Sequence, residues 1–137
     1  MTKFQSLIED FEKSVLRLEE ILKHEKNDII RDSAIKRFEI AFELAWKTSK
    51  SFLEEMHTST CVSPRTCFQE LFRVGLIDYN DQWLRLLDDR NYTAHVYREV
   101  LAEKVYADLP NALQAFETLL RAFHDYVQQN LHQLGKE

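Results

Sequence analysis

The chain has 137 residues, of which 45% are hydrophobic and 30% are charged, as expected for one globular domain. With only two glycines and two prolines, the composition favours long helices and argues against a turn-rich β fold. The formal net charge of −5 argues against a protein that coats nucleic acid, whose surface would be broadly basic.

No apolar run approaches the roughly 20 residues that cross a bilayer. The first residues, MTKFQSLIEDFEKSV, place acids inside the apolar pattern and so differ from a signal peptide. We therefore expect a cytoplasmic protein without a membrane contact. Cys61 and Cys67 are the only cysteines, and without a secretion signal we expect free thiols, with neither a disulfide nor a metal site.

Apolar residues at every third or fourth position predict a first helix over about residues 3 to 23. After a polar loop, a second helix is expected to begin between Asp28 and Ser33, either of which could be its N-cap. This second helix has a wide aromatic stripe. The stripe predicts that it is the central helix, with Phe42 and Trp46 as core residues.

The third helix has recognisable signals at both ends. Ser63 and Pro64 are typical of an N-cap followed by the first helical position. Gly75 followed by Leu76 predicts a Schellman ending in which Leu76 packs back on Leu71. Local geometry therefore explains Gly75 without a ligand.

Asp78 is expected to cap a fourth helix. The apolar rhythm of that helix stops in the segment from Arg90 to Tyr97, and a last helix resumes at about Arg98. Pro110 predicts a break or a kink in this last helix, where Asp108 could cap a restart.

The last helix is expected to carry its apolar stripe as far as Leu131, followed by a polar tail over residues 133–137. The whole chain, residues 1–137, is thus predicted to be a single all-α domain of five or six helices in an antiparallel bundle. The first and last helices keep near-heptad spacing, which favours a homodimer.

Several chemistries have no motif in this sequence. There is no GxxxxGK[ST] phosphate loop, no HExxH, no paired CxxC and no GxSxG. A minimal nucleotidyltransferase needs a Gly-Ser turn beside two metal-binding aspartates, and the chain has neither that turn nor a strand to carry it. We expect the chain not to be a transferase itself, and we expect no metal and no cofactor.

Arg90, Asn91, His95 and Tyr97 are the residues best suited to chemistry. Histidine can take or give a proton near neutral pH. Arginine presents a planar fork that suits a phosphate, and asparagine can orient a neighbour or donate to a phosphoryl oxygen. Tyrosine offers a hydroxyl that can donate, accept or be modified.

Spacing limits how these residues could meet. In a continuous helix Asn91 and His95 would share a face, whereas Arg90 and His95 would lie about 140° apart. The two could act on one phosphate only if the helix unwinds between them or a second subunit completes the site. A purely structural role is the alternative, with Arg90 paired to Asp88 or Asp89 and His95 at a helix end.

Two sequence segments resemble a known family. RNYTAHVY, from Arg90 to Tyr97, matches the R-x4-H-x-Y motif of HepT-like HEPN proteins. RFEIAFELAWKTSKSFLEE, residues 37–55, resembles the central helix of their relatives, the nucleotidyltransferase substrate-binding proteins. The resemblance extends over about residues 4 to 125 and is quite specific when both motifs are taken together.

This resemblance implies a four- or five-helix bundle, usually a homodimer, that partners a minimal nucleotidyltransferase in a toxin–antitoxin-like module. It implies that Arg90 and His95 form the catalytic pair of a metal-independent ribonuclease, with Asn91 in support. It also implies that the partner transferase adenylylates Tyr97 and thereby silences the ribonuclease.

Three functional hypotheses follow. The chain is a helical partner subunit of a nucleotidyltransferase that presents Tyr97, or a HepT-like ribonuclease that uses Arg90 and His95, or a helical dimer without catalysis. The first two are compatible in one protein. Because acids flank the motif, RNA binding would require a dimer that gathers arginines such as Arg85 and Arg98 into one cleft.

Overall fold

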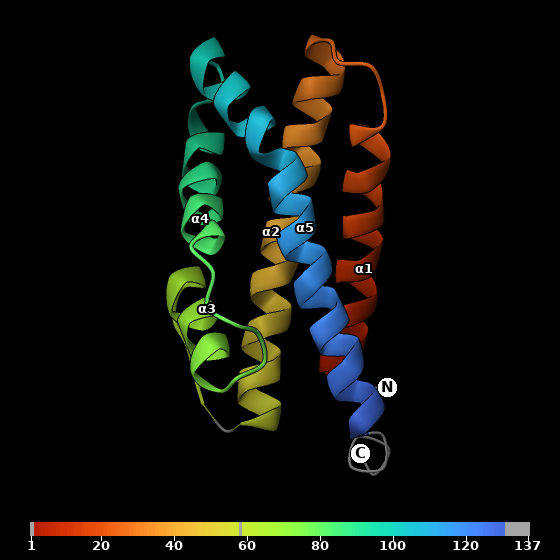
Figure 1. The fold of residues 1–137 in the computed structure, drawn as a ribbon, viewed down its shortest axis with the longest axis vertical. Helices are drawn as coiled ribbons and strands as arrows, with labels where there is room; N and C mark the ends of the chain where they lie inside the picture. Colours follow the sequence, from red (N-terminus) through yellow and green to blue (C-terminus); the bar gives the residue numbers. More distant parts are fainter. Residues whose placement is uncertain (1, 58, 131–137) are drawn as a thin grey trace.

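Five α-helices and one short 3-10 helix make up the fold: α1 (Lys3–Leu22), α2 (Asp28–Met56), α3 (Pro64–Arg73), α4 (Gln82–Tyr92), η1 (Thr93–His95) and α5 (Glu99–Gln129). This computed structural model describes residues 2–57 and 59–130, and those ranges contain no strand. α1, α2 and α5 run side by side along the long axis, while α3 and α4 follow one another on the side away from α1 (Figure 1). The predicted all-α bundle is confirmed.

Phenylalanine side chains dominate the core where the helices meet. The Phe4 ring of α1 lies 5.5 Å from Phe52 of α2 and 5.5 Å from Phe123 of α5. Farther along, Phe68 of α3 packs on Trp83 of α4 at 4.6 Å. Burying a ring of this size stabilises the fold by about 2 kcal/mol. The apolar stripes expected on the first, second and last helices therefore face one another, and α2 contacts α1, α3 and α5 as a central helix should.

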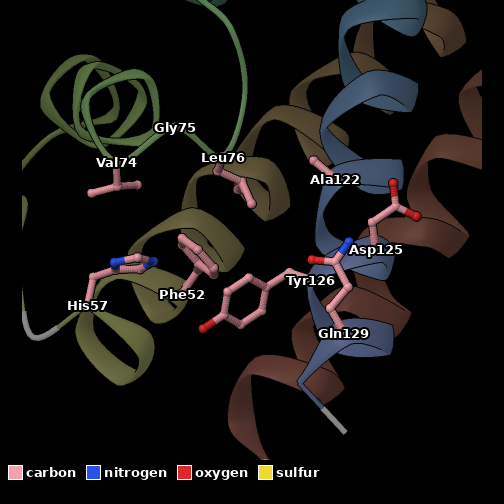
Figure 2. A pocket seen from close by; sticks show the side chains of 9 residues that line it. All are labelled: Phe52, His57, Val74, Gly75, Leu76, Ala122, Asp125, Tyr126 and Gln129. Atoms are coloured by element: carbon pink, nitrogen blue, oxygen red, sulfur yellow. The ribbon is translucent and has the colours of Figure 1, made fainter.

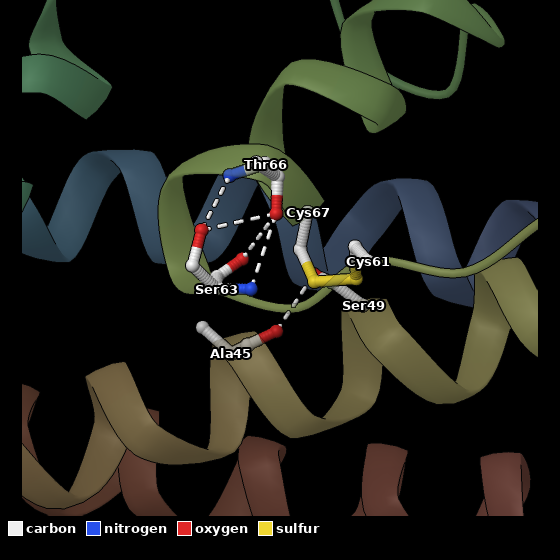
Figure 3. The surroundings of a disulfide bond; sticks show 6 residues. All are labelled: Ala45, Ser49, Cys61, Ser63, Thr66 and Cys67. Atoms are coloured by element: carbon white, nitrogen blue, oxygen red, sulfur yellow. Dashed lines mark hydrogen bonds between the residues drawn. A yellow bond between two sulfur atoms is a disulfide. The ribbon is translucent and has the colours of Figure 1, made fainter.

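The ends of α3 are as the sequence predicts. The Ser63 hydroxyl accepts a hydrogen bond from the Thr66 amide at 3.2 Å, and the Thr66 hydroxyl accepts one from the Ser63 amide at 3.1 Å (Figure 3). At the other end Gly75 has φ +80°, a left-handed conformation that side chains disfavour. The Leu76 amide donates to the Leu71 carbonyl at 3.1 Å, which completes the Schellman ending.

The N-cap of α2 differs from the prediction. Asn27 is the cap: its backbone is extended and its side-chain oxygen accepts from the Ile30 amide at 2.8 Å. Asp28 is the first helical residue, and its negative charge stabilises the helix by interacting with the positive end of the helix dipole. Because Asp28 is already helical, the polar loop ends one residue earlier than expected. Ser33 lies inside the helix and caps nothing.

Two further expectations about caps are wrong. Asp78 does not cap α4, which begins at Gln82; Asn80 accepts from the Gln82 amide at 2.9 Å in the preceding loop. Pro110 does not break α5, and Asp108 lies within that helix rather than at a restart. Because the flanking side chains Leu109 and Ala112 are fully buried, packing holds the helix continuous through the proline.

The expectation of free thiols is also wrong. Cys61 and Cys67 form a disulfide, with their Cα atoms 5.1 Å apart (Figure 3). The extended segment before α3 reverses at Ser63 and Pro64, and this turn brings Cys61 over Cys67 on the first turn of the helix. The expectation relied on compartment and composition, which say nothing about this local geometry.

The end of the last helix is described only in part. α5 is described as far as Gln129, so Leu131 and the polar tail over 133–137 lie outside the described residues. Over the described part of the chain, no helix combines the length and apolar character needed to cross a bilayer.

Candidate functional site

The R-x4-H-x-Y segment lies at one end of the bundle, where α4 gives way to α5. The α-helical geometry ends at Tyr92 and tightens into the 3-10 turn Thr93–His95 before α5 begins at Glu99. The Thr93 hydroxyl donates to the Arg90 carbonyl at 2.6 Å, which satisfies one of the acceptors that the ending helix leaves free. The α-helix therefore ends between Arg90 and His95, as the loss of apolar rhythm indicates, but the backbone tightens there into a 3-10 turn instead of unwinding.

A tight turn brings His95 and Tyr97 together. The Arg98 amide donates to the His95 carbonyl at 3.0 Å, and Val96 between them has φ −74° and ψ −3°. This turn places the His95 Nδ1 atom 3.4 Å from the Tyr97 hydroxyl, with the two rings 75° apart in an edge-to-face arrangement. The Tyr97 side chain is 78% exposed, so its hydroxyl is accessible from solvent.

Arg90 has different neighbours. Its guanidinium lies over the Phe42 ring of α2, 5.8 Å from the ring centroid. Among the described residues Arg90 forms no ion pair with Asp88 or Asp89 and no hydrogen bond with His95, so the alternative in which Arg90 pairs with an aspartate is wrong. Arg90 instead completes a groove of about 440 Å³ along the outer face of α2, whose other lining residues are Lys36, Glu39, Ile40, Glu43, Leu44 and Lys47.

One subunit therefore joins two of the predicted site residues and leaves the others apart. His95 and Tyr97 are in contact, Arg90 faces the α2 groove, and Asn91 is exposed on the last turn of α4. No group of three or more His, Cys, Asp or Glu side chains within residues 2–57 and 59–130 could hold a metal ion. A single subunit therefore presents the Tyr97 phenol with the His95 imidazole beside it.

Asp89, which precedes the motif arginine, is a buried carboxyl that sequence reasoning placed wrongly. The Asp89 side chain is 2% exposed and faces α5. Burial is the largest cause that raises the pKa of Asp89 to about 8, followed by the hydrogen bond to Asp108 and the negative charge of Asp108. Lys104 opposes this shift. The spacing offered a signal, because Asp89 follows the buried Leu86 by three residues and so lies on the inner face of α4.

Arg31 is a second charged residue that sequence reasoning missed. Its guanidinium is 3% exposed and binds Glu99 at 2.7 Å, Glu103 at 2.9 Å and Asp32 at 3.0 Å. The hydrogen bond to Arg31 lowers the pKa of Glu99. The pKa of Glu103 is lowered most by its hydrogen bond to Lys26 and next by its hydrogen bond to Arg31. Glu99 is the first residue of α5, so Arg31 anchors the helix start that directly follows the His95–Tyr97 turn.

A separate hollow of about 330 Å³ lies at the opposite end of the bundle, near the end of α5. Figure 2 shows the side chains around it, which are Phe52, His57, Val74, Gly75, Leu76, Ala122, Asp125, Tyr126 and Gln129. The Phe52 and Tyr126 rings meet edge to face at 4.9 Å. None of the four motif residues lines this hollow, so it is distinct from the candidate site.

Comparisons with known proteins identify relatives of this chain. A family model described as "Nucleotidyltransferase substrate binding protein like" matches residues 6–132. A protein of Haemophilus influenzae described as "Probable ribonuclease HepT" is 31% identical over 90 residues, which cover 63% of this chain. The match spans 62% of that relative, less than two thirds of its length.

Two solved structures have the same fold. A crystal structure of a Thermus thermophilus protein superposes with a TM-score of 0.78 at 32% identity and covers 82% of this chain and 98% of that one. The HI0074 protein of Haemophilus influenzae is 24% identical with a TM-score of 0.64, over 88% of this chain and 96% of that one. HI0074 is described as having the fold of a substrate-binding domain of a nucleotidyltransferase, and at this identity the likeness shows the fold alone.

Proposed function

The chain belongs to the family of nucleotidyltransferase substrate-binding proteins, and from this premise we propose that it is the helical partner subunit of a minimal nucleotidyltransferase. In this proposal the two proteins form a toxin–antitoxin-like module. Tyr97 of the helical subunit is the residue that the transferase modifies with AMP.

The observation that carries the proposal is the position of Tyr97. The hydroxyl of Tyr97 lies at an exposed turn between two helices, with 78% of the side chain accessible. Only a side chain that extends from the surface can enter the active site of another enzyme. An AMP on this hydroxyl would add a negative charge and bulk beside His95, 3.4 Å away, and would so block that imidazole.

The test is a transfer reaction with the proposed partner, a purified minimal nucleotidyltransferase from the same organism. With ATP, intact mass spectrometry should show one or more AMP groups on the wild-type chain and none on Tyr97→Phe. Tyr79→Phe is the matched control, because Tyr79 is also an exposed tyrosine, at 63%. Modification of Tyr97→Phe at the wild-type rate would assign the acceptor elsewhere and refute the role of Tyr97.

The similarity to a protein described as a ribonuclease favours a second function, metal-independent cleavage of RNA. In this proposal the RNA 2′-hydroxyl attacks the adjacent phosphate, His95 moves the proton, and Arg90 stabilises the charge of the phosphorane. Because Arg90 faces the α2 groove while His95 contacts Tyr97, the pair would have to be completed across a homodimer. The groove includes Ile40, which is 45% exposed and suits such a contact.

Two measurements test this second function. Arg90→Ala and His95→Ala should each abolish growth inhibition and RNA cleavage, while light scattering should report a dimer for both variants. Ile40→Glu should convert the dimer to a monomer and abolish cleavage together. Cleavage that survives His95→Ala would refute the catalytic role of His95. A monomeric wild type would refute completion of the site across a homodimer.

A further inference from the structure

We propose that His95 has a second task, as the base that takes the phenolic proton of Tyr97 when the transferase modifies that residue. The helical subunit would then supply part of the chemistry of its own modification. This inference rests on the proposed function, because it requires Tyr97 to be the acceptor of the nucleotide.

His95 and Tyr97 are already close to the geometry for proton transfer. The His95 Nδ1 atom lies 3.4 Å from the Tyr97 oxygen, slightly beyond the 2.6–3.2 Å of a working acid–base contact, which often shortens only when the complex forms. The contact spans two residues and is set by the backbone turn from His95 to Arg98, closed by a 3.0 Å hydrogen bond. It therefore needs no rearrangement of the bundle.

The chemistry requires such a base. The Tyr97 oxygen attacks the α-phosphorus of a nucleoside triphosphate and forms a new O–P bond. The bond from that phosphorus to the bridging oxygen breaks, and pyrophosphate leaves with the electron pair. The phenolic proton goes to Nδ1 of His95. Free tyrosine keeps its proton up to about pH 10, so at neutral pH the attack needs an acceptor for it.

Comparison with the other exposed tyrosine supports the assignment. The Tyr79 hydroxyl donates to the Asp81 carboxylate at 2.5 Å, and this hydrogen bond raises the pKa of Tyr79. A carboxylate of that kind disfavours the phenolate through its charge, whereas a neutral imidazole accepts the proton without such repulsion. Tyr97 is thus the exposed tyrosine whose hydroxyl lies beside a group that can accept its proton.

Among the described residues, no ionisable side chain other than His95 is in hydrogen-bond contact with Tyr97. Tyr97 is likewise the one titratable group in hydrogen-bond contact with His95 within residues 2–57 and 59–130, and no salt bridge there engages either residue. The imidazole is also exposed, so it can release the proton to solvent after each transfer.

The experiment measures AMP transfer from ATP by the purified partner transferase between pH 5.5 and 9.5, on the wild type, His95→Gln, His95→Ala and Tyr97→Phe. For the wild type we expect kcat to rise through roughly pH 5 to 8, the range in which imidazoles lose their proton. For His95→Gln we expect kcat to fall about 100-fold with little change in KM for this chain. Free imidazole should restore part of the rate of His95→Ala, which a merely structural role would not permit.

The outcomes separate the two proposals. If His95→Gln is modified on Tyr97 with the wild-type rate and pH profile, the transferase supplies the base and this inference is wrong, while the proposed function stands. If the wild type receives no AMP, or Tyr97→Phe still receives it, the proposed role of Tyr97 fails first. Thermal melting of each variant checks that the exposed substitutions leave the fold intact.

Discussion

Replacing Asp89 by asparagine should remove most of the alkaline sensitivity of the fold. Asp89 is 2% exposed on the inner face of α4, and its side-chain oxygen Oδ2 has no hydrogen-bond partner among the described residues. Burial and the nearby Asp108 carboxyl raise the pKa of Asp89 to about 8. The folded chain therefore keeps a proton on this carboxyl at neutral pH, whereas the unfolded chain has released it.

The sign and size of the effect follow from this difference in proton binding. Between the unfolded value near 4 and the folded value of about 8, the folded state holds more protons than the unfolded state, so stability falls as the pH rises. Over pH 6 to 9 the loss is on the order of 2 kcal/mol, and it levels off once the folded carboxyl has ionised. Asparagine cannot ionise, so Asp89→Asn should lack this slope and gain about 2 kcal/mol over the wild type across the same interval.

The assay is urea unfolding, followed by circular dichroism, at half-unit pH steps from 6 to 9.5. Asp88→Asn is the matched control, because Asp88 is the exposed neighbour on the same helix and should keep the wild-type slope. Asp108→Asn should flatten the slope in part, since it removes the charge but not the burial. If wild type and Asp89→Asn lose stability in parallel, then the reasoning about this carboxyl is refuted.

Three further predictions concern stability at neutral pH and use the same unfolding assay. Arg31→Ala should cost about 2 kcal/mol because it leaves the acids of two helices facing each other. Arg73→Ala, which removes an exposed ion pair with Glu70, should cost much less; equal costs would contradict the importance of burial. Reducing the bond between Cys61 and Cys67 should cost about 2 kcal/mol, as expected for closing a loop of this length, and an unchanged stability in dithiothreitol would show that the disulfide does not contribute. Gly75→Ala should cost about 1 kcal/mol from its positive φ alone, since no atom lies within 4 Å of the added carbon, and a neutral result would count against the left-handed conformation.

The features that the sequence predicted well are those that depend on near neighbours. The start and the end of α3 follow from Ser63, Pro64 and Gly75, because a cap or a left-handed turn involves residues three to five positions apart. The end of the α-helix after Arg90 is of the same kind, since it appears as a local loss of apolar rhythm. The helical stripes also predicted the core, because they depend on a period of 3.6 residues.

The features that the sequence did not predict depend on distant pairs. Arg31 meets Glu99 across 68 positions, and Asp89 meets Asp108 of another helix, a pairing that no local pattern specifies. Arg90 and Asp89 are adjacent, and a change of about 100° in helix rotation decides which of them is buried. The contact of His95 with Tyr97 required the particular turn between them, which residue types alone do not give.

The Phe42 ring beneath Arg90 has a consequence for any anion that enters the α2 groove. A free arginine side chain loses up to about 2 kcal/mol of rotamer entropy when it is fixed on a ligand. Here the aromatic face already restrains the guanidinium, while within the described structure no acceptor occupies its N–H donors. An incoming phosphate would thus bind a guanidinium that is already oriented. Much of the loss of side-chain entropy would have occurred when the bundle folded and not when the phosphate binds.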